Sequence, residues 1–87
     1  MSDITYNELE KGDTVYFARI LPRIKIYEVL NLNIVTIIDT YCTGVNPKNN
    51  QTYVFPKKYA EEVLFKNRRL ALEYLDSKLN ENIGDDK

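Results

Sequence analysis

The chain has 87 residues, of which 44% are hydrophobic, and a formal net charge of −1. This length fits one domain with a single core, and the hydrophobic fraction excludes disorder throughout. The sequence lacks an apolar run of the about 20 residues that a membrane-spanning helix needs, so we expect no membrane partner. It also has no basic segment leading into an apolar one at its start, so no secretory signal is expected.

Cys42 is the single cysteine, so no intramolecular disulfide can form. A secreted domain of this size usually depends on disulfides, and we therefore expect the protein to be cytoplasmic, in a reducing environment. Cys42 lies in a strand-like context, which indicates a structural thiol that is at least half-buried.

The charge is segregated along the chain. The formal net charge is −3 over residues 1–18, +5 over residues 19–69 and −3 over residues 70–87. A basic middle between acidic ends indicates a polar partner.

The first predicted elements lie before Pro22. Residues 4–11 predict a turn or one helical turn that Ile4, Tyr6 and Leu9 attach to the core. Gly12-Asp13 predicts a turn into a strand at Thr14–Leu21, which Pro22 ends.

A longer β-rich stretch follows at residues 27–38, and the break in its alternation predicts a bend, a bulge or a tight turn at residues 30–33. A strand is expected at residues 40–45, a turn at residues 46–51 and a short strand at residues 52–55 that Pro56 ends.

The last third predicts a surface turn at residues 57–62 and a short strand at residues 63–65. Asn67 is a suitable N-cap for a helix over about residues 67–82. The helical period places four apolar residues on one arc with two more on its flank: Ala71, Leu72, Leu75 and Leu79, then Leu70 and Tyr74. Residues 83–87 are expected to form a frayed acidic tail.

These elements predict an α+β fold. A long bent strand is what a small barrel needs to pass from one sheet to the other, so we expect a small, strongly bent antiparallel β-barrel of four to five strands. One C-terminal amphipathic helix caps this barrel, and together they form a single domain over residues 1–82.

The sequence argues against catalysis. It contains no histidine, which removes the commonest general base and the commonest metal ligand. With a single cysteine, the usual sets of zinc ligands cannot form either. The three glycines stand apart, so no phosphate-binding glycine loop is present. Asp39 is the one acid within the β-rich region, where a strand-end turn is the simpler role. We therefore expect no enzyme, no cofactor and no metal.

Aromatic and basic residues alternate through the middle of the chain. This pattern is typical of surfaces on small barrels that bind single-stranded nucleic acid, and such barrels bind peptides in the same way. Tyrosines in strands also serve as core edges and cross-strand partners. The predicted binding residues are Arg19, Arg23, Lys25, Tyr27, Tyr41, Lys57, Lys58 and Tyr59.

Three segments carry a resemblance to a known group of proteins. They are Lys-Gly-Asp-Thr-Val-Tyr-Phe-Ala-Arg-Ile at residues 11–20, Tyr-Glu-Val-Leu at residues 27–30 and Val-Leu-Phe-Lys-Asn-Arg-Arg-Leu-Ala-Leu at residues 63–72. They resemble small uncharacterised proteins encoded by phages and prophages of low-GC Gram-positive bacteria. The resemblance implies an SH3-like barrel with a C-terminal helix and carries over no catalytic residue.

Three functional hypotheses follow. The first is a phage-derived binding protein that recognises and inhibits a host or defence-system protein, as anti-CRISPR proteins do. The alternative is a nucleic-acid-binding module that uses the same basic and aromatic residues. The third is a structural or accessory phage protein, either a monomer or a homodimer that pairs through an open sheet edge.

Overall fold

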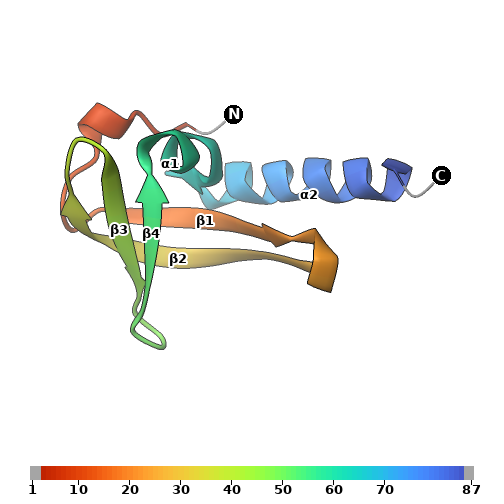
Figure 1. The fold of residues 1–87 in the computed structure, drawn as a ribbon, viewed down its shortest axis with the longest axis horizontal. Coiled ribbons are helices and arrows are strands. Elements are labelled where there is room, and N and C mark those ends of the chain that lie inside the picture. Colours follow the sequence, from red (N-terminus) through yellow and green to blue (C-terminus); the bar gives the residue numbers. More distant parts are fainter. Residues whose placement is uncertain (1–2, 86–87) are drawn as a thin grey trace.

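The computed structural model describes residues 3–85, with side chains described through residue 80. In this part of the chain, five strands form one antiparallel sheet in the order β4-β3-β2-β1-β5 (Figure 1). The strands are β1 (Thr14–Leu21), β2 (Ile26–Ile37), β3 (Tyr41–Asn46), β4 (Gln51–Pro56) and β5 (Leu64–Phe65). The helices are α1 (Lys57–Val63) and α2 (Arg68–Asp85), and the short 3-10 turns are η1 (Tyr6–Glu8) and η2 (Pro22–Ile24).

β1 and β2 form a long hairpin that extends beyond the rest of the sheet (Figure 1). Its register runs without interruption from Thr14 opposite Asn33 to Leu21 opposite Ile26. The predicted bounds of β1 are confirmed, and Pro22, which has no N–H for the ladder, opens η2. The outer part of this hairpin, residues 19–28, is called the hairpin arm below.

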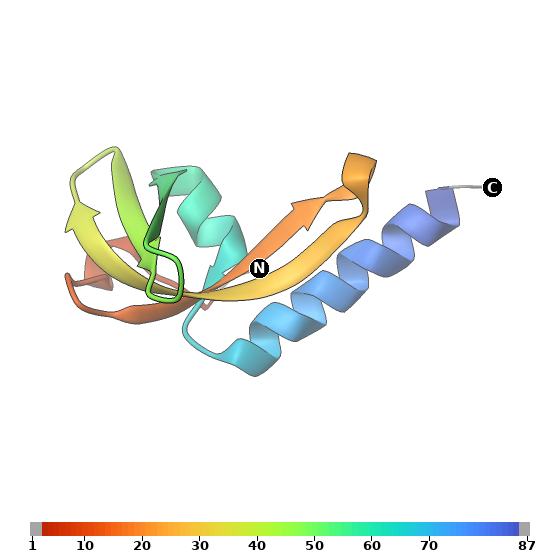
Figure 2. The ribbon, with the colours of Figure 1, turned by 90° about the horizontal axis from the view of Figure 1, so that it is seen from below.

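The sheet bends within β2. The pairing with β3 shifts between Ile34 and Thr36, so Val35 is the extra residue of a bulge. The predicted bend at residues 30–33 therefore lies slightly too early, because alternate burial continues through Leu32 and Ile34 before it breaks. As a result, β3 and β4 cross the β1–β2 hairpin steeply, and Figure 2 shows the hairpin curving away from the crossing.

The main core lies where the two parts of the sheet cross. Phe17 of β1 packs edge-on against Phe55 of β4, with ring centroids 4.8 Å apart and planes at 83°. Leu32 and Leu64 have no exposed surface. The predicted anchoring of the N-terminal segment is confirmed, because three of its residues are buried in this core: Ile4, Tyr6 and Leu9.

α2 covers the opposite face of the β1–β2 hairpin (Figure 2). Ala71 is fully buried there and packs with Ala18 of β1 and Phe65 of β5. Tyr74 and Leu75 lie half-buried beside them. Spacings of three and four residues place these side chains on one face of the helix, which is the period expected from the sequence.

The apolar arc predicted for α2 is only partly buried. Leu70, Leu72 and Leu79 stay 37%, 39% and 37% exposed. The hairpin beneath the helix is two strands wide, so it covers a narrow strip and leaves the margins of the arc open. The helix continues to Asp85, beyond its predicted end, and residues 86–87 of the predicted tail lie outside the described residues.

The surface turn predicted at residues 57–62 is wrong, because this segment is the helix α1. Pro56, expected only to stop β4, holds φ at −55° as the N-cap residue of the helix. Ala60 and Val63, three residues apart, are buried on one side, while the glutamates between them are exposed. The helix also shortens the last predicted strand, which begins at Leu64.

The structure confirms an α+β fold with an antiparallel sheet and a C-terminal helix. Closure of the sheet into a barrel is not shown. β4 and β5 stand at the two ends of the strand order, and no pairing joins them within residues 3–85.

Candidate functional site

The eight predicted binding residues lie in three regions. Arg23 and Lys25 are exposed at the tip of the hairpin arm, and Tyr27 follows them at the start of β2. Arg19 on β1 and Tyr59 on α1 form a second region.

The third region joins Tyr41 to the start of α1. Tyr41 is opposite Pro56 in the β3–β4 ladder, and Lys57 donates its backbone N–H to Thr40 at 3.0 Å. Lys58 is exposed on α1. The structure therefore does not gather the predicted residues into one continuous patch.

The second region contains a fixed ion pair. Arg19 and Glu28 face each other across the β1–β2 ladder, with Arg19 Nη1 donating to Glu28 Oε2 at 2.7 Å. The two side chains are 30% and 41% exposed. A cross-strand pair of opposite charge holds both side chains in one orientation. Glu28 is not among the predicted binding residues, although a hairpin turn at residues 22–25 places it opposite Arg19.

Tyr59 lies beside this ion pair on a support of aromatic rings. Its ring stacks on Phe55, with centroids 5.9 Å apart and planes at 20°, and meets Phe17 edge-on at 6.3 Å. Tyr59 is 41% exposed. We call Arg19, Glu28 and Tyr59 the Arg19–Tyr59 surface.

The pKa of the Tyr59 hydroxyl depends on its burial and on the charges around it. Partial burial raises the pKa of the Tyr59 hydroxyl, the charge of Glu62 raises this pKa further, and the charge of Arg19 acts in the opposite direction. The hydroxyl therefore stays protonated at neutral pH and can both donate and accept a hydrogen bond. A protonated tyrosine hydroxyl near a paired arginine side chain is suited to binding a polar partner.

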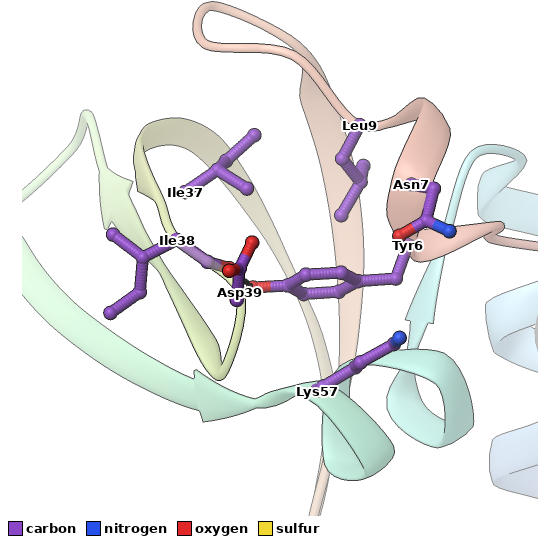
Figure 3. Close-up of a pocket in the computed structure, with 7 residues that line it drawn as sticks. All are labelled: Tyr6, Asn7, Leu9, Ile37, Ile38, Asp39 and Lys57. Atoms are coloured by element: carbon purple, nitrogen blue, oxygen red, sulfur yellow. Dashed lines mark hydrogen bonds between the residues drawn. The ribbon is translucent and has the colours of Figure 1, made fainter.

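A pocket of about 330 Å³ opens elsewhere, between η1, the β2–β3 turn and the start of α1 (Figure 3). The Tyr6 hydroxyl donates to the Ile38 carbonyl at 2.7 Å, and Lys57 Nζ lies 5.7 Å from the centre of the Tyr6 ring. Burial raises the pKa of Tyr6, and the charges of Cys42 and Asp39 raise it further. The Tyr6 hydroxyl is already hydrogen-bonded to the backbone, so the residues that line this pocket serve mainly to anchor the N-terminal segment. Asp39 lies in the turn, in agreement with its expected role.

The sheet surface around β4 is an exposed feature of which only Tyr41 is among the predicted binding residues. Val54 is 60% exposed and Tyr41 is 38% exposed, and both lie on the outer face of the β3–β4 hairpin. β4 is also the last strand of the sheet on its side. The alternation of Val54 with the buried Phe55 is the signal that would have indicated an outward apolar face.

Several cations of the basic segment have acidic neighbours. Besides the Arg19 pair, Arg69 Nε lies 3.2 Å from Glu73 Oε2, and Lys66 Nζ lies 4.0 Å from Glu8 Oε1. These acids reduce the positive potential that the charge distribution along the chain indicates. The local surface is therefore of mixed charge.

Cys42 is buried, as expected, and burial raises the pKa of its thiol. Among the described residues, no three His, Cys, Asp or Glu side chains are grouped to hold a metal ion. No helix in that part of the chain is long and apolar enough to cross a membrane.

Comparison of the chain with protein-family models, with curated proteins and with solved structures finds no match. The geometry and the charge of the surface are therefore the evidence for function.

Proposed function

We propose that this protein is a non-enzymatic binding module that recognises another protein through the Arg19–Tyr59 surface. The observation that carries the proposal is the Arg19–Glu28 ion pair, 2.7 Å long, beside a tyrosine ring stacked on Phe55. Tyrosine and arginine are enriched among the residues that contribute most to protein–protein binding. Both side chains are held in place before a partner arrives, which lowers the entropy lost on binding.

Charge pairing favours a protein partner over a nucleic acid. Nucleic-acid binding needs cations that can neutralise phosphates, and Arg19 already has a carboxylate at 2.7 Å. Glu62 adds negative charge beside Tyr59. Arg23 and Lys25, the exposed cations at the arm tip, support the nucleic-acid alternative, which the experiment below tests.

The proposal extends to origin and target. The resemblance of residues 11–20, 27–30 and 63–72 to phage-encoded proteins supports a phage-derived inhibitor of a host or defence-system protein that acts in the bacterial cytoplasm. The bent β2 strand and the steep crossing of the sheet are in keeping with an SH3-like barrel type.

A charge swap tests the contact surface. Arg19→Glu/Glu28→Arg leaves the net charge unchanged and should retain the ion pair and the fold, but it reverses the charges that a partner meets. The matched control is Arg69→Glu/Glu73→Arg, which reverses another exposed pair on α2. We expect tagged wild type and control to retain one protein from nuclease-treated lysate of a low-GC Gram-positive bacterium. The Arg19/Glu28 swap and Tyr59→Ala should weaken its binding at least about tenfold.

Equal retention by the wild type and the Arg19/Glu28 swap would exclude this surface as the contact. A salt-sensitive shift of single-stranded DNA or RNA that Arg23→Glu/Lys25→Glu abolishes, with no protein retained, would establish the nucleic-acid alternative instead.

A further inference from the structure

The backbone of β4 has hydrogen-bonding groups that point out of the sheet. Ile38 donates its N–H to the Tyr41 carbonyl at 2.9 Å, so the backbone groups of Tyr41 point toward β2. Backbone direction alternates along an antiparallel strand, so Thr43 and Val45 also point toward β2. Their partners on β4 are Val54 and Thr52. The N–H and C=O groups of these two residues therefore point away from β3, toward the free edge.

This edge has few of the features by which proteins block strand pairing. Gln51–Pro56 contains no charged residue, its register with β3 is continuous, and the proline stands only at the end of the strand. The nearest charges, Lys48 in the preceding turn and the lysines of α1, lie outside the strand. The opposite end of the sheet differs, because β5 has two residues, both buried, and lies between two helices.

The free edge of β4 faces the side of the molecule on which the hairpin arm lies, and the arm curves upward in Figure 2. In both Figure 1 and Figure 2, β3 lies on one side of β4, and α1 and, farther away, the arm lie on the other side. The ring of Tyr53 points to the inner face of the sheet, where its centroid is 5.6 Å from that of Phe17. Tyr59 packs on the same Phe17 ring at 6.3 Å. The edge and the Arg19–Tyr59 surface therefore adjoin each other.

We propose that the β4 edge binds an extended segment of the partner protein by strand addition. The inference rests on the proposed protein-binding function and specifies the form of the partner. The backbone of the segment pairs with Thr52 and Val54. Its alternate side chains point inward and pack against Tyr53 and Tyr59, so apolar or aromatic residues fit there. A strand edge without charged residues is suited to an uncharged segment. The arm lies on this side of β4 and leaves less room for a second folded copy, which favours one extended segment.

The protein side of the test removes one outward N–H. A displayed dodecapeptide library is selected on the wild-type protein, and the enriched peptides are synthesised. Val54→Pro should weaken their binding at least about tenfold, whereas Val54→Thr, which keeps the N–H, should preserve it. The Val54 N–H makes no bond to β3, and its side chain is 60% exposed, so neither change should unfold the protein. Unchanged thermal unfolding checks this point.

The peptide side of the test is independent of how variants fold. In strand addition only every second N–H of the peptide faces β4, so N-methylation should abolish binding at alternate positions and be tolerated between them. In labelled protein, the Thr52 and Val54 amides should become protected from hydrogen exchange when the peptide binds.

Three results would overturn strand addition. They are the absence of enriched peptides, equal binding by Val54→Pro, and an N-methyl scan without period two. Self-association of the free protein that Val54→Pro abolishes would make a second copy the occupant instead. In each case, loss of the captured protein in the Arg19/Glu28 swap would still support the proposed function, and that function fails separately if the swap has no effect.

Discussion

Gly44 of β3 lies directly against the side chain of Leu32 of β2. A Cβ atom on Gly44 would come within 3.2 Å of Leu32 Cβ and 3.3 Å of Leu32 Cδ1. Leu32 has no exposed surface, so its side chain has little room to move away. The close approach of the two strands at this point depends on the missing side chain of Gly44.

Gly44→Ala should therefore destabilise the fold. Overpacking a filled core typically costs about 1–3 kcal/mol, and we expect a loss of this size in the free energy of unfolding, measured by urea denaturation. Thr43→Ala, which shortens a half-buried side chain on the outer face of the same strand, is the control and should cost less. A Gly44→Ala protein as stable as the wild type would contradict the close approach.

Asn67 should be needed as the N-cap of α2. Its Oδ1 accepts a hydrogen bond from the Arg69 N–H at 2.8 Å, which satisfies one of the free amides of the first turn. Asn67→Ala should lower the free energy of unfolding by about 1 kcal/mol, whereas Asn67→Ser should retain most of the stability. Thermal unfolding followed by circular dichroism distinguishes the two variants. Equal stability of both would show that the cap contributes nothing.

Stability should fall at alkaline pH. Burial raises the pKa of the Cys42 thiol, and the pKa of Tyr6 is raised by burial and then by the charges of Cys42 and Asp39. Both groups are neutral when protonated, so the folded protein keeps these protons at a pH where the unfolded chain has lost them. Their contribution is complete at neutral pH and is lost as the pH rises above about 8.5 for the thiol and about 10 for the phenol.

Cys42→Ala separates the two groups. The variant should be less stable at every pH because it loses buried volume, but its free energy of unfolding should change less between about pH 8.5 and pH 10 than that of the wild type. Urea denaturation across this range measures the slope. An identical slope in both proteins would exclude the thiol as the titrating group.

The elements with local signals could be predicted from the sequence. Pro22 ends β1 because proline has no N–H for the ladder, and Asn67 begins α2 because its side chain caps free amides. The helix α1 could not be predicted because a proline is common both at the end of a strand and at the start of a helix, and Pro56 fits either. The burial of Ala60 and Val63, three residues apart, decides between them.

The candidate site was predicted only in part. Arg19 and Tyr59 are forty positions apart in the sequence, and they lie on the same surface because the sheet bends and Tyr59 of α1 packs on Phe17 of β1. Arg23 and Lys25, which are closer to Arg19 in the sequence, lie at the arm tip because they belong to the hairpin turn. Proximity along the chain is therefore a poor guide to the surface.

The sequence by itself determined the bounds of β1, the cap of α2, the burial of Cys42 and the anchoring of the N-terminal segment, because backbone propensity and apolar spacing act over a few residues. The tertiary structure decided that Tyr59 of α1 packs on Phe17 of β1 and that β4 ends the sheet on its side. It did so because strand register and the bulge at Val35 set which distant residues meet, and neither depends on local propensity alone.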